Sequence, residues 1–266
     1  APPEPRFRLT QERVEAQSQA LADELQALRP QRPGVVDMYV LTFAPDANAV
    51  FRRESAVVAE VMGQRFDAVG RTVELVSHRD DAPRPAWATL LNLRRALKRV
   101  AALMNRDEDV LFIHLSSHGA RNAELVPDFW PLHVEPLTPA LLKQWLDEEG
   151  IRWRVVSVSA CYSGSWIAPL SGDGTLVLTA ADAEHTSYGC GRRSEMTFFG
   201  RAMYDEQLRR TGSFEQAHAA ARTVIAQREK AAGKEDGFSN PQIAVGAGIA
   251  RRLQVLKAQQ ERAQAS

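Results

Sequence analysis

Cysteine is the residue this sequence has least of, since only Cys161 and Cys190 occur among its 266 residues. Two cysteines are too few for the disulfide framework that stabilises small secreted proteins. No apolar run approaches the roughly 20 residues that a membrane-spanning helix needs. Basic and acidic residues are equal at 33 each, so the global charge does not indicate binding to nucleic acid or to an anionic membrane.

The sequence also lacks an initiator Met, because it begins at Ala1. We therefore expect a processed or trimmed piece of a longer protein, with a removed signal or a membrane anchor lying outside this chain. The corresponding expectation for its location is extracytoplasmic, either periplasmic or membrane-anchored.

The pattern of apolar residues predicts one large α/β domain. At 44% apolar and 25% charged residues, the chain is long enough to bury such a core. Six Val-rich segments alternate with amphipathic ones, which is typical of a parallel sheet covered by helices. We divide the chain into an N-terminal helical arm (1–34), the domain (35–250) and a C-terminal tail (251–266). Strands are predicted at 35–43, 72–77, 175–181 and 241–245 and within the stretches 109–120 and 152–166, and helices at 50–69, 87–104, 138–149, 194–210 and 213–230.

Two of these strands end in residues that carry chemistry. The stretch 152–166 runs through Val158 into Ala-Cys161, and the stretch 109–120 ends in His118-Gly119. Ligands of open α/β sheets bind beyond the carboxyl ends of the strands, so adjacent strands would place the imidazole beside the thiol. A thiolate is the reactive form of cysteine, and a neighbouring base activates it. We therefore predict that Cys161 is a nucleophile with His118 as its base.

Small residues surround this proposed nucleophile. Gly119 can bring its N–H close to a substrate carbonyl, and with the N–H of Cys161 it would form a two-donor oxyanion hole. The small residues after the cysteine, up to Ser165, leave room for a substrate backbone. A disulfide would consume the nucleophile, so we expect two free thiols, with Cys190 in a structural role.

The blocks around these residues resemble those of the legumain and GPI-transamidase family of caspase-fold cysteine peptidases, and its bacterial members most closely. His118 precedes Cys161 by 43 residues, against about 50 in caspases. The resemblance spans roughly residues 35–250. The matching residues are Ser117-His118-Gly119, Ala160-Cys161-Tyr-Ser163-Gly164-Ser165, Thr179-Ala-Ala181 and Ser187-Tyr-Gly-Cys190.

This resemblance implies an α/β, caspase-like three-layer fold with a six-stranded, mostly parallel sheet flanked by helices. It also implies a cysteine endopeptidase that acts on a peptide or protein substrate through a Cys161 thioester, with His118 as general base and acid. No metal, cofactor or nucleic acid is expected to take part. Such enzymes can also pass the acyl group to an amine, so a transpeptidase or ligase is the alternative within the same fold.

The sequence departs from the family's pattern in the pocket that reads the residue before the scissile bond (P1). The family has Glu two residues before the nucleophile, where this chain has Ser159, and an Asp where our alignment places Arg201. The pocket's basic residue is retained as Arg52, and Ser187 completes the predicted substrate-binding set. Arginines pair with carboxylates in bidentate geometry, so we predict a preference for Asp or Glu at P1.

The family also has an Asn that orients the catalytic histidine. The aligned position here is apolar Val50. Asn48, two residues earlier, is the predicted substitute.

Three other interpretations stay open. Cys161 could be an inert core cysteine, because free cysteine is among the most buried residue types. It could instead be the nucleophile of an α/β-hydrolase-like enzyme with His185 or His218 as base, although Ser159 and Ser163 stand where that nucleophile elbow has glycines. Finally, the altered pocket leaves open a non-catalytic, peptide-binding scaffold.

Overall fold

The computed structural model describes residues 7–234 and 237–264. The outermost residues of the predicted arm (1–6) and tail (265–266) lie outside this range, as do residues 235–236. The elements, in chain order, are α1 (Gln11–Ala27), β1 (Met38–Ala44), α2 (Ala49–Arg65), β2 (Thr72–Val76), α3 (Leu90–Leu103), β3 (Val110–Ser116), β4 (His118–Gly119), β5 (Leu125–Val126), α4 (Pro139–Glu148), β6 (Arg154–Ser159), η1 (Ser163–Trp166), α5 (Ile167–Leu170), β7 (Thr175–Thr179), α6 (Phe198–Gly200), the π-helical η2 (Arg201–Leu208), α7 (Phe214–Ala231), β8 (Gln242–Val245) and α8 (Ala247–Gln264).

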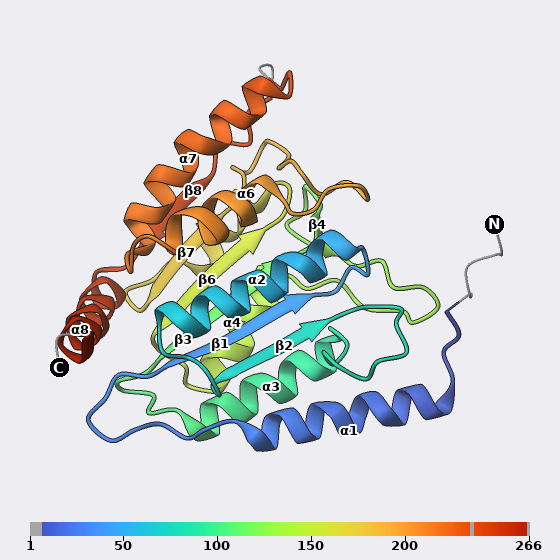
Figure 1. Cartoon of the computed structure of the whole chain (residues 1–266), viewed down its shortest axis with the longest axis horizontal. Coiled ribbons are helices and arrows are strands. Elements are labelled where there is room, and N and C mark those ends of the chain that lie inside the picture. Colours follow the sequence, from blue (N-terminus) through green and yellow to red (C-terminus); the bar gives the residue numbers. More distant parts are fainter. Residues whose placement is uncertain (1–6, 235–236, 265–266) are drawn as a thin grey trace.

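A six-stranded sheet in the order β2-β1-β3-β6-β7-β8 forms the centre of the molecule (Figure 1). Strands β2, β1, β3, β6 and β7 run parallel, and β8 pairs antiparallel with β7. Every residue of β1 and β3 is buried, as their Val- and Leu-rich sequences predict for strands covered on both faces. The predicted six-stranded, mostly parallel sheet is confirmed.

Helices cover both faces of this sheet and give three layers (Figure 1). Alternate residues of a strand point to opposite faces. Accordingly Tyr39 and Leu41 of β1 pack in a core with α1, α3 and α4, whereas Met38 and Val40 pack in a second core with α2, η2, α7 and α8. The caspase-like three-layer arrangement thus follows from period-two burial of the strands.

The predicted arm and tail both pack against the domain. In α1, Leu21 is buried in the first core, and the Glu24 carboxylate accepts a hydrogen bond from the backbone of edge strand β2, at Glu74 (3.0 Å). In α8, Leu256 is buried in the second core. Gln259 of the same helix bonds both the N–H and the C=O of Val36, at 2.9 and 3.2 Å.

Element boundaries differ from the predictions where the backbone conformation changes locally. The helix predicted to reach residue 69 ends at Arg65, because Asp67 takes a left-handed conformation with φ of 53°. By contrast, Thr138 caps α4 as its Thr-Pro sequence predicts, accepting a hydrogen bond from Leu141 N–H at 3.2 Å.

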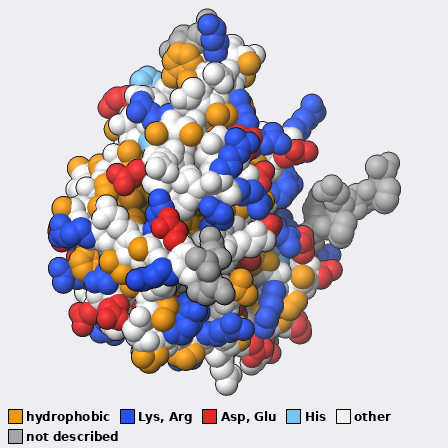
Figure 2. All heavy atoms as spheres, turned by 60° about the vertical axis from the view of Figure 1, so that its left-hand side comes forward, with side chains coloured by type: hydrophobic (Ala, Val, Ile, Leu, Met, Phe, Trp, Pro, Cys, Tyr) orange, Lys and Arg blue, Asp and Glu red, His pale blue; other side chains and the backbone are white. Residues whose placement is uncertain are grey.

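Figure 2 shows basic side chains scattered over one face of the molecule, with acidic side chains between them. Among the described residues, no helix has the length and apolar character needed to cross a membrane.

Candidate active site

The ends of two central strands bring the predicted nucleophile and base to one edge of the sheet. Strands β3 and β6 are parallel neighbours, with Ser116 opposite Ser159. The pairing continues one step further, where the Ser117 N–H donates to the carbonyl of Ser159 at 3.2 Å. His118 and Cys161 each lie two residues beyond this last pair of the ladder. Both therefore emerge at the carboxyl edge of the sheet, where ligands of α/β proteins bind.

Gly119 lies directly against the backbone of Cys161, the predicted nucleophile. A Cβ atom at this position would lie 2.1 Å from the carbonyl oxygen of Cys161 and 3.1 Å from the Cβ of Ala160. Only glycine permits so close an approach of two backbones. The structure thus brings the His-Gly and Ala-Cys blocks together, as the sequence predicts.

The sulfur of Cys161 is half-buried and surrounded by hydrogen-bond donors. Its Sγ accepts from the N–H of Ser187 at 3.3 Å, and the Ser187 hydroxyl lies 3.7 Å away. A hydrogen bond from the Cys190 thiol is the largest influence on the pKa of Cys161, and burial opposes it. With further contributions from Ser187 and the charge of His118, the pKa of Cys161 falls to about 6. A lowered pKa favours the thiolate, which is the nucleophilic form of cysteine.

Cys190 has a contact beyond the structural role that the sequence predicts. Both cysteines are free thiols. Cys190 also packs among the apolar side chains beside α2, but its thiol donates to Cys161, which raises the pKa of Cys190 itself. It supports the nucleophile as well as the fold.

The imidazole of His118 lies between an aromatic ring and a carboxylate. The Phe51 ring packs against it nearly at a right angle, with an interplanar angle of 89° and ring centroids 5.1 Å apart. Its Nε2 is 4.0 Å from the Oδ2 atom of Asp46, which lies in the loop between β1 and α2. Asn48, predicted to orient the histidine, instead donates to Asp46 Oδ1 through its backbone N–H (2.8 Å) and its Nδ2 (2.6 Å). Val50 is buried in the apolar cluster beside the site.

The residue after the nucleophile is held in a strained conformation. Tyr162 has φ of 57°, in the left-handed region that residues other than glycine rarely adopt. Its N–H donates to the carbonyl of His185 at 2.9 Å, and the guanidinium of Arg121 lies 4.6 Å from its ring centroid. Because of this turn, the chain leaves the Cys161 sulfur immediately after the end of β6.

Two of the small residues after Cys161 serve packing rather than substrate access. The hydroxyl of Ser163 accepts from the N–H of Ala181 at 3.0 Å. A Cβ on Gly164 would lie 2.6 Å from backbone atoms of Asp182 and Ala183. Ser163 and Gly164 thus hold the turn after Cys161 against the chain that follows β7.

Of the predicted substrate-binding residues, the structure places Ser187 beside the sulfur. Ser159 is buried, with its hydroxyl 3.3 Å from that of Thr197. The arginines are engaged elsewhere among the described residues. Arg52 pairs with Asp80 beyond β2, and Arg201 lies 3.5 Å from Glu195.

A fully buried carboxylate behind the site was missed by the sequence reasoning. Glu54 of α2 accepts from His114 Nε2 (3.0 Å), from the Ser116 hydroxyl (3.0 Å) and from the Thr197 hydroxyl (2.5 Å). Burial acts to raise the pKa of Glu54, but these hydrogen bonds outweigh it and the pKa is lowered. The sequence does contain a pattern that indicates this residue. Glu54 lies four residues before Val58, on the apolar face of the helix, where a charged side chain is unusual.

The two histidines considered as alternative bases have other surroundings. His185 Nδ1 is 2.8 Å from the Asp182 carboxylate, and its ring is half-exposed. His218 is buried in α7, where burial lowers its pKa to about 4. The imidazole whose charge acts on Cys161 is that of His118.

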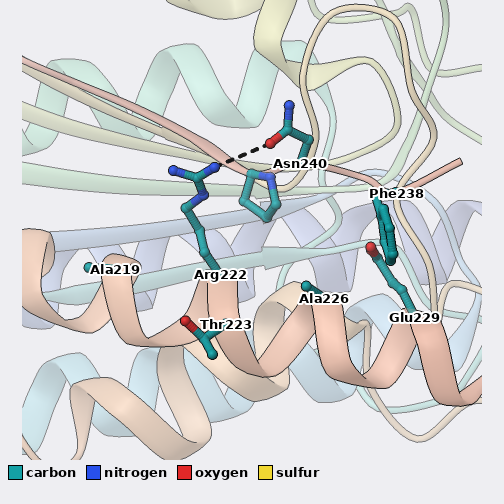
Figure 3. Close-up of a pocket in the computed structure, with 8 residues that line it drawn as sticks. Ala219, Arg222, Thr223, Ala226, Glu229, Phe238 and Asn240 are labelled. Carbon is teal, nitrogen blue, oxygen red and sulfur yellow. Dashed lines mark hydrogen bonds between the residues drawn. The ribbon is translucent and has the colours of Figure 1, made fainter. Parts of the chain in front are cut away.

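A separate hollow of about 420 Å³ lies between α7 and the chain entering β8 (Figure 3). Arg222 donates to Asn240 at 3.2 Å across it, and Asn240 donates to Asp182 at 3.1 Å. The hollow is thus linked to the loop of the active site, although none of the predicted site residues lines it. No group of three or more potential metal ligands occurs within residues 7–234 and 237–264.

Comparisons with known proteins agree with this geometry. The model of the peptidase C13 family matches residues 88–246, a span that includes both His118 and Cys161. A search of curated proteins found no match. Among solved structures, the crystal structure of caspase-1 from Spodoptera frugiperda is similar, with a TM-score of 0.56 and 13% identity over 82% of this chain and 93% of that chain. At this identity the similarity shows the fold, which is that of caspases.

Proposed function

Since the chain belongs to the peptidase C13 family, the family of legumain, we propose that it is a cysteine endopeptidase that cleaves peptide bonds through a thioester on Cys161. His118 is the general base and acid in this proposal. One observation carries it: the His118-Gly119 block and Cys161 follow adjacent central strands and meet in direct backbone contact. The low pKa of Cys161 supports the nucleophilic role.

Acylation starts from the Cys161 thiolate. Its sulfur attacks the scissile carbonyl carbon, and the carbonyl electron pair moves to oxygen. When the tetrahedral intermediate collapses, the C–N bond breaks and protonated His118 gives its proton to the leaving amine. A thioester and a neutral imidazole result.

Deacylation reverses these roles. His118 takes a proton from a water molecule, whose oxygen attacks the thioester carbonyl, and the sulfur leaves as thiolate. An amine in place of water would yield a new peptide bond instead. The exposed imidazole, with 41% of its side chain accessible, leaves room for either acceptor.

Backbone donors support oxyanion binding at this point. Bonded and non-bonded pairs alternate along an antiparallel ladder. In the β4–β5 hairpin the Ala120 N–H donates to the Glu124 carbonyl at 2.9 Å, so the next pair, Gly119 with Leu125, is non-bonded. The Gly119 N–H therefore points away from β5. With the N–H of Cys161 it provides the two donors of the proposed oxyanion hole.

We extend the proposal to an acidic preference at P1. Ser159 supplies no carboxylate that would repel an acidic substrate side chain. Arg52 is adjacent in sequence to Phe51, whose ring contacts His118, so Arg52 lies close to the proposed base along the chain. Arg52 already pairs with a carboxylate, that of Asp80, on the molecular surface. Surface ion pairs contribute little, about 0–1 kcal/mol, so a substrate carboxylate can replace this partner. Arg201, with its distant pairing to Glu195, can do the same.

A panel of fluorogenic peptides that differ only in Asp, Glu, Asn or Gln at P1 tests both parts of the proposal. We expect kcat/KM to fall by about 10³-fold or more in Cys161→Ala and His118→Ala, as for other nucleophile and base deletions. Arg52→Gln and Arg201→Gln should lower kcat/KM for the acidic peptides by about tenfold, as expected when a charged hydrogen bond is lost.

Arg209→Gln is the matched control, because Arg209 pairs with Asp205 and Glu60 on the surface, away from the site. Cleavage that survives in Cys161→Ala would refute the nucleophile. Cleavage after Asn alone would keep the nucleophile and refute the arginine pocket. Adding an amine-bearing peptide and measuring ligated against hydrolysed product separates the two acyl acceptors.

A further inference from the structure

The loop between β1 and α2 buries a carboxylate that is only half satisfied. The side chain of Asp46 is 1% exposed. Its Oδ1 accepts both hydrogen bonds from Asn48, which fixes the orientation of the carboxylate. Its Oδ2 is also buried, and no described residue donates to it. A buried carboxylate oxygen without a donor is costly, so its retention here needs a reason.

The free oxygen is directed at the proposed general base. Oδ2 of Asp46 and Nε2 of His118 are 4.0 Å apart, about 1 Å longer than a hydrogen bond. The Phe51 ring packs nearly at a right angle to the imidazole of His118, and this contact limits where the imidazole can move. Hydrogen bonds of catalytic groups are often long in unliganded enzymes and shorten when substrate binds. The closing movement required here is small.

We propose that Asp46 is the positioning residue for His118, accepting a hydrogen bond from its Nε2–H so that Nδ1 is the nitrogen that exchanges protons with the substrate. The inference rests on the proposed function. The carboxylate would set the tautomer of the neutral imidazole and stabilise the imidazolium that forms in each cycle. A carboxylate from the loop thus takes the place that the apolar Val50 leaves without a polar group.

The charges around this pair are few. Asn48 contacts Asp46 from its own loop, and Cys161 faces His118 from the end of β6. Asp128, in the loop after β5, is the other carboxylate that acts on Asp46, and it lies 3.8 Å from Arg79. Burial is the largest influence on the pKa of Asp46 and raises it overall, with Asp128 acting in the same direction, although Asn48 and His118 act to lower it. Asp128→Asn therefore removes a nearby negative charge without touching the imidazole, and it serves as the matched control.

The test compares wild type, Asp46→Asn and Asp128→Asn. Side-chain ¹⁵N NMR is recorded on each protein in the Cys161→Ala background, at a pH where the imidazole is neutral, with His118 assigned by the His118→Gln spectrum, and it shows which ring nitrogen carries the proton. We expect Nε2–H in wild type and Asp128→Asn, and a shift toward Nδ1–H in Asp46→Asn. On the best peptide, Asp46→Asn should lower kcat by roughly 10²-fold or more with KM within about threefold, by analogy with other orienting carboxylates.

Two results would overturn the proposal: an Nδ1–H tautomer in the wild type, or the same tautomer and kcat in Asp46→Asn. The wild-type spectrum gives an answer even if Asp46→Asn fails to fold. Failure of the proposed function is seen separately, as cleavage that persists in Cys161→Ala. The tautomer measurement does not depend on that outcome.

Discussion

The acidity of Cys161 depends first on another cysteine. The Cys190 thiol lowers the pKa of Cys161 more than the charge of His118 does. Sequence reasoning identified the histidine, because His118 ends a recognisable strand. The sequence predicted only a structural role for Cys190, which is brought to the site by the irregular chain between β7 and α6. No periodic pattern predicts where such a segment places a side chain.

Replacing Cys190 with Ala removes this donor and should raise the pKa of Cys161 from about 6 toward the ordinary thiol value of about 8.5. Below the new pKa the sulfur is protonated, so reactivity at pH 7 should fall. The pH midpoint of alkylation by iodoacetamide measures this directly. Cys190→Ser keeps a donor and should shift the midpoint less; an unchanged midpoint in Cys190→Ala would contradict the assignment.

Gly119 gives a second prediction at the same scale. In Gly119→Ala the new methyl group would overlap the Cys161 carbonyl, forcing the β4 backbone and its N–H away. Loss of one oxyanion donor costs about 10²–10³-fold in kcat, and we expect a decrease of that order. Gly212→Ala is the control, since nothing lies within 4 Å of a Cβ there. Equal activity of the two variants would exclude the tight contact.

Three residues in the first half of helix α2 contact three different parts of the site. Phe51 packs on the imidazole of His118, the proposed general base. Arg53 donates to the carbonyls of Ser194 and Glu195 at 2.6 and 2.8 Å, which holds the chain after Cys190. Glu54 crosses to β3 and reaches His114. The helix therefore connects the base, the loop beside the nucleophile and the sheet.

Glu54→Gln should destabilise the fold by about 1–3 kcal/mol or more, because the amide cannot accept all the hydrogen bonds that His114, Ser116 and Thr197 give to the buried carboxylate. The pKa of Glu54 is lowered in the folded state. Its contribution is therefore present above the unfolded carboxyl pKa of about 4.3 and is lost as the pH falls through the folded value. Urea unfolding at pH 7 and below pH 4 should show the difference from wild type shrinking in acid.

Glu60→Gln, on the exposed face of the same helix, should change stability by less than about 1 kcal/mol at either pH. If Glu54→Gln changed the free energy of unfolding as little as this control, the buried hydrogen bonds of Glu54 would not stabilise the fold.

The sequence predicted the strands and long helices well, but it did not predict the short hairpin or the irregular helix. All six strands were found because buried β-branched runs are distinctive. The β4–β5 hairpin is too short for a periodicity to show. The π-helical turn of η2 also has no pattern in the sequence, and it depends on packing against α2 and α7.

Over the whole molecule, α1 and α8 cover opposite faces of one sheet. The sequence predicted only a C-terminal tail from residue 251 onward, where the structure has the helix α8. Packing against β7 in the second core was not visible from the helix alone. Contacts between distant parts of the chain thus decide whether a weakly amphipathic helix belongs to a core.

The burial of α8 is testable with neighbouring residues. Leu256→Ala should lower the free energy of unfolding by about 2–5 kcal/mol, the range for buried leucines. Leu256 is 2% exposed, whereas Val255 beside it is 47% exposed. Val255→Ala should stay within about 0.5 kcal/mol of wild type. Chemical denaturation of both variants measures this, and equal small effects would mean that α8 is loosely attached.

The contact between Gln259 and Val36 ties the last helix to the chain entering the first strand. Ribosomes add about 5–20 residues per second, so β1, β3 and β6 leave the exit tunnel well before α8 is complete. Until then part of the second core stays uncovered. A nascent chain therefore presents its cysteine and histidine strands before the second core is closed, and that core is completed only after residue 259 has emerged.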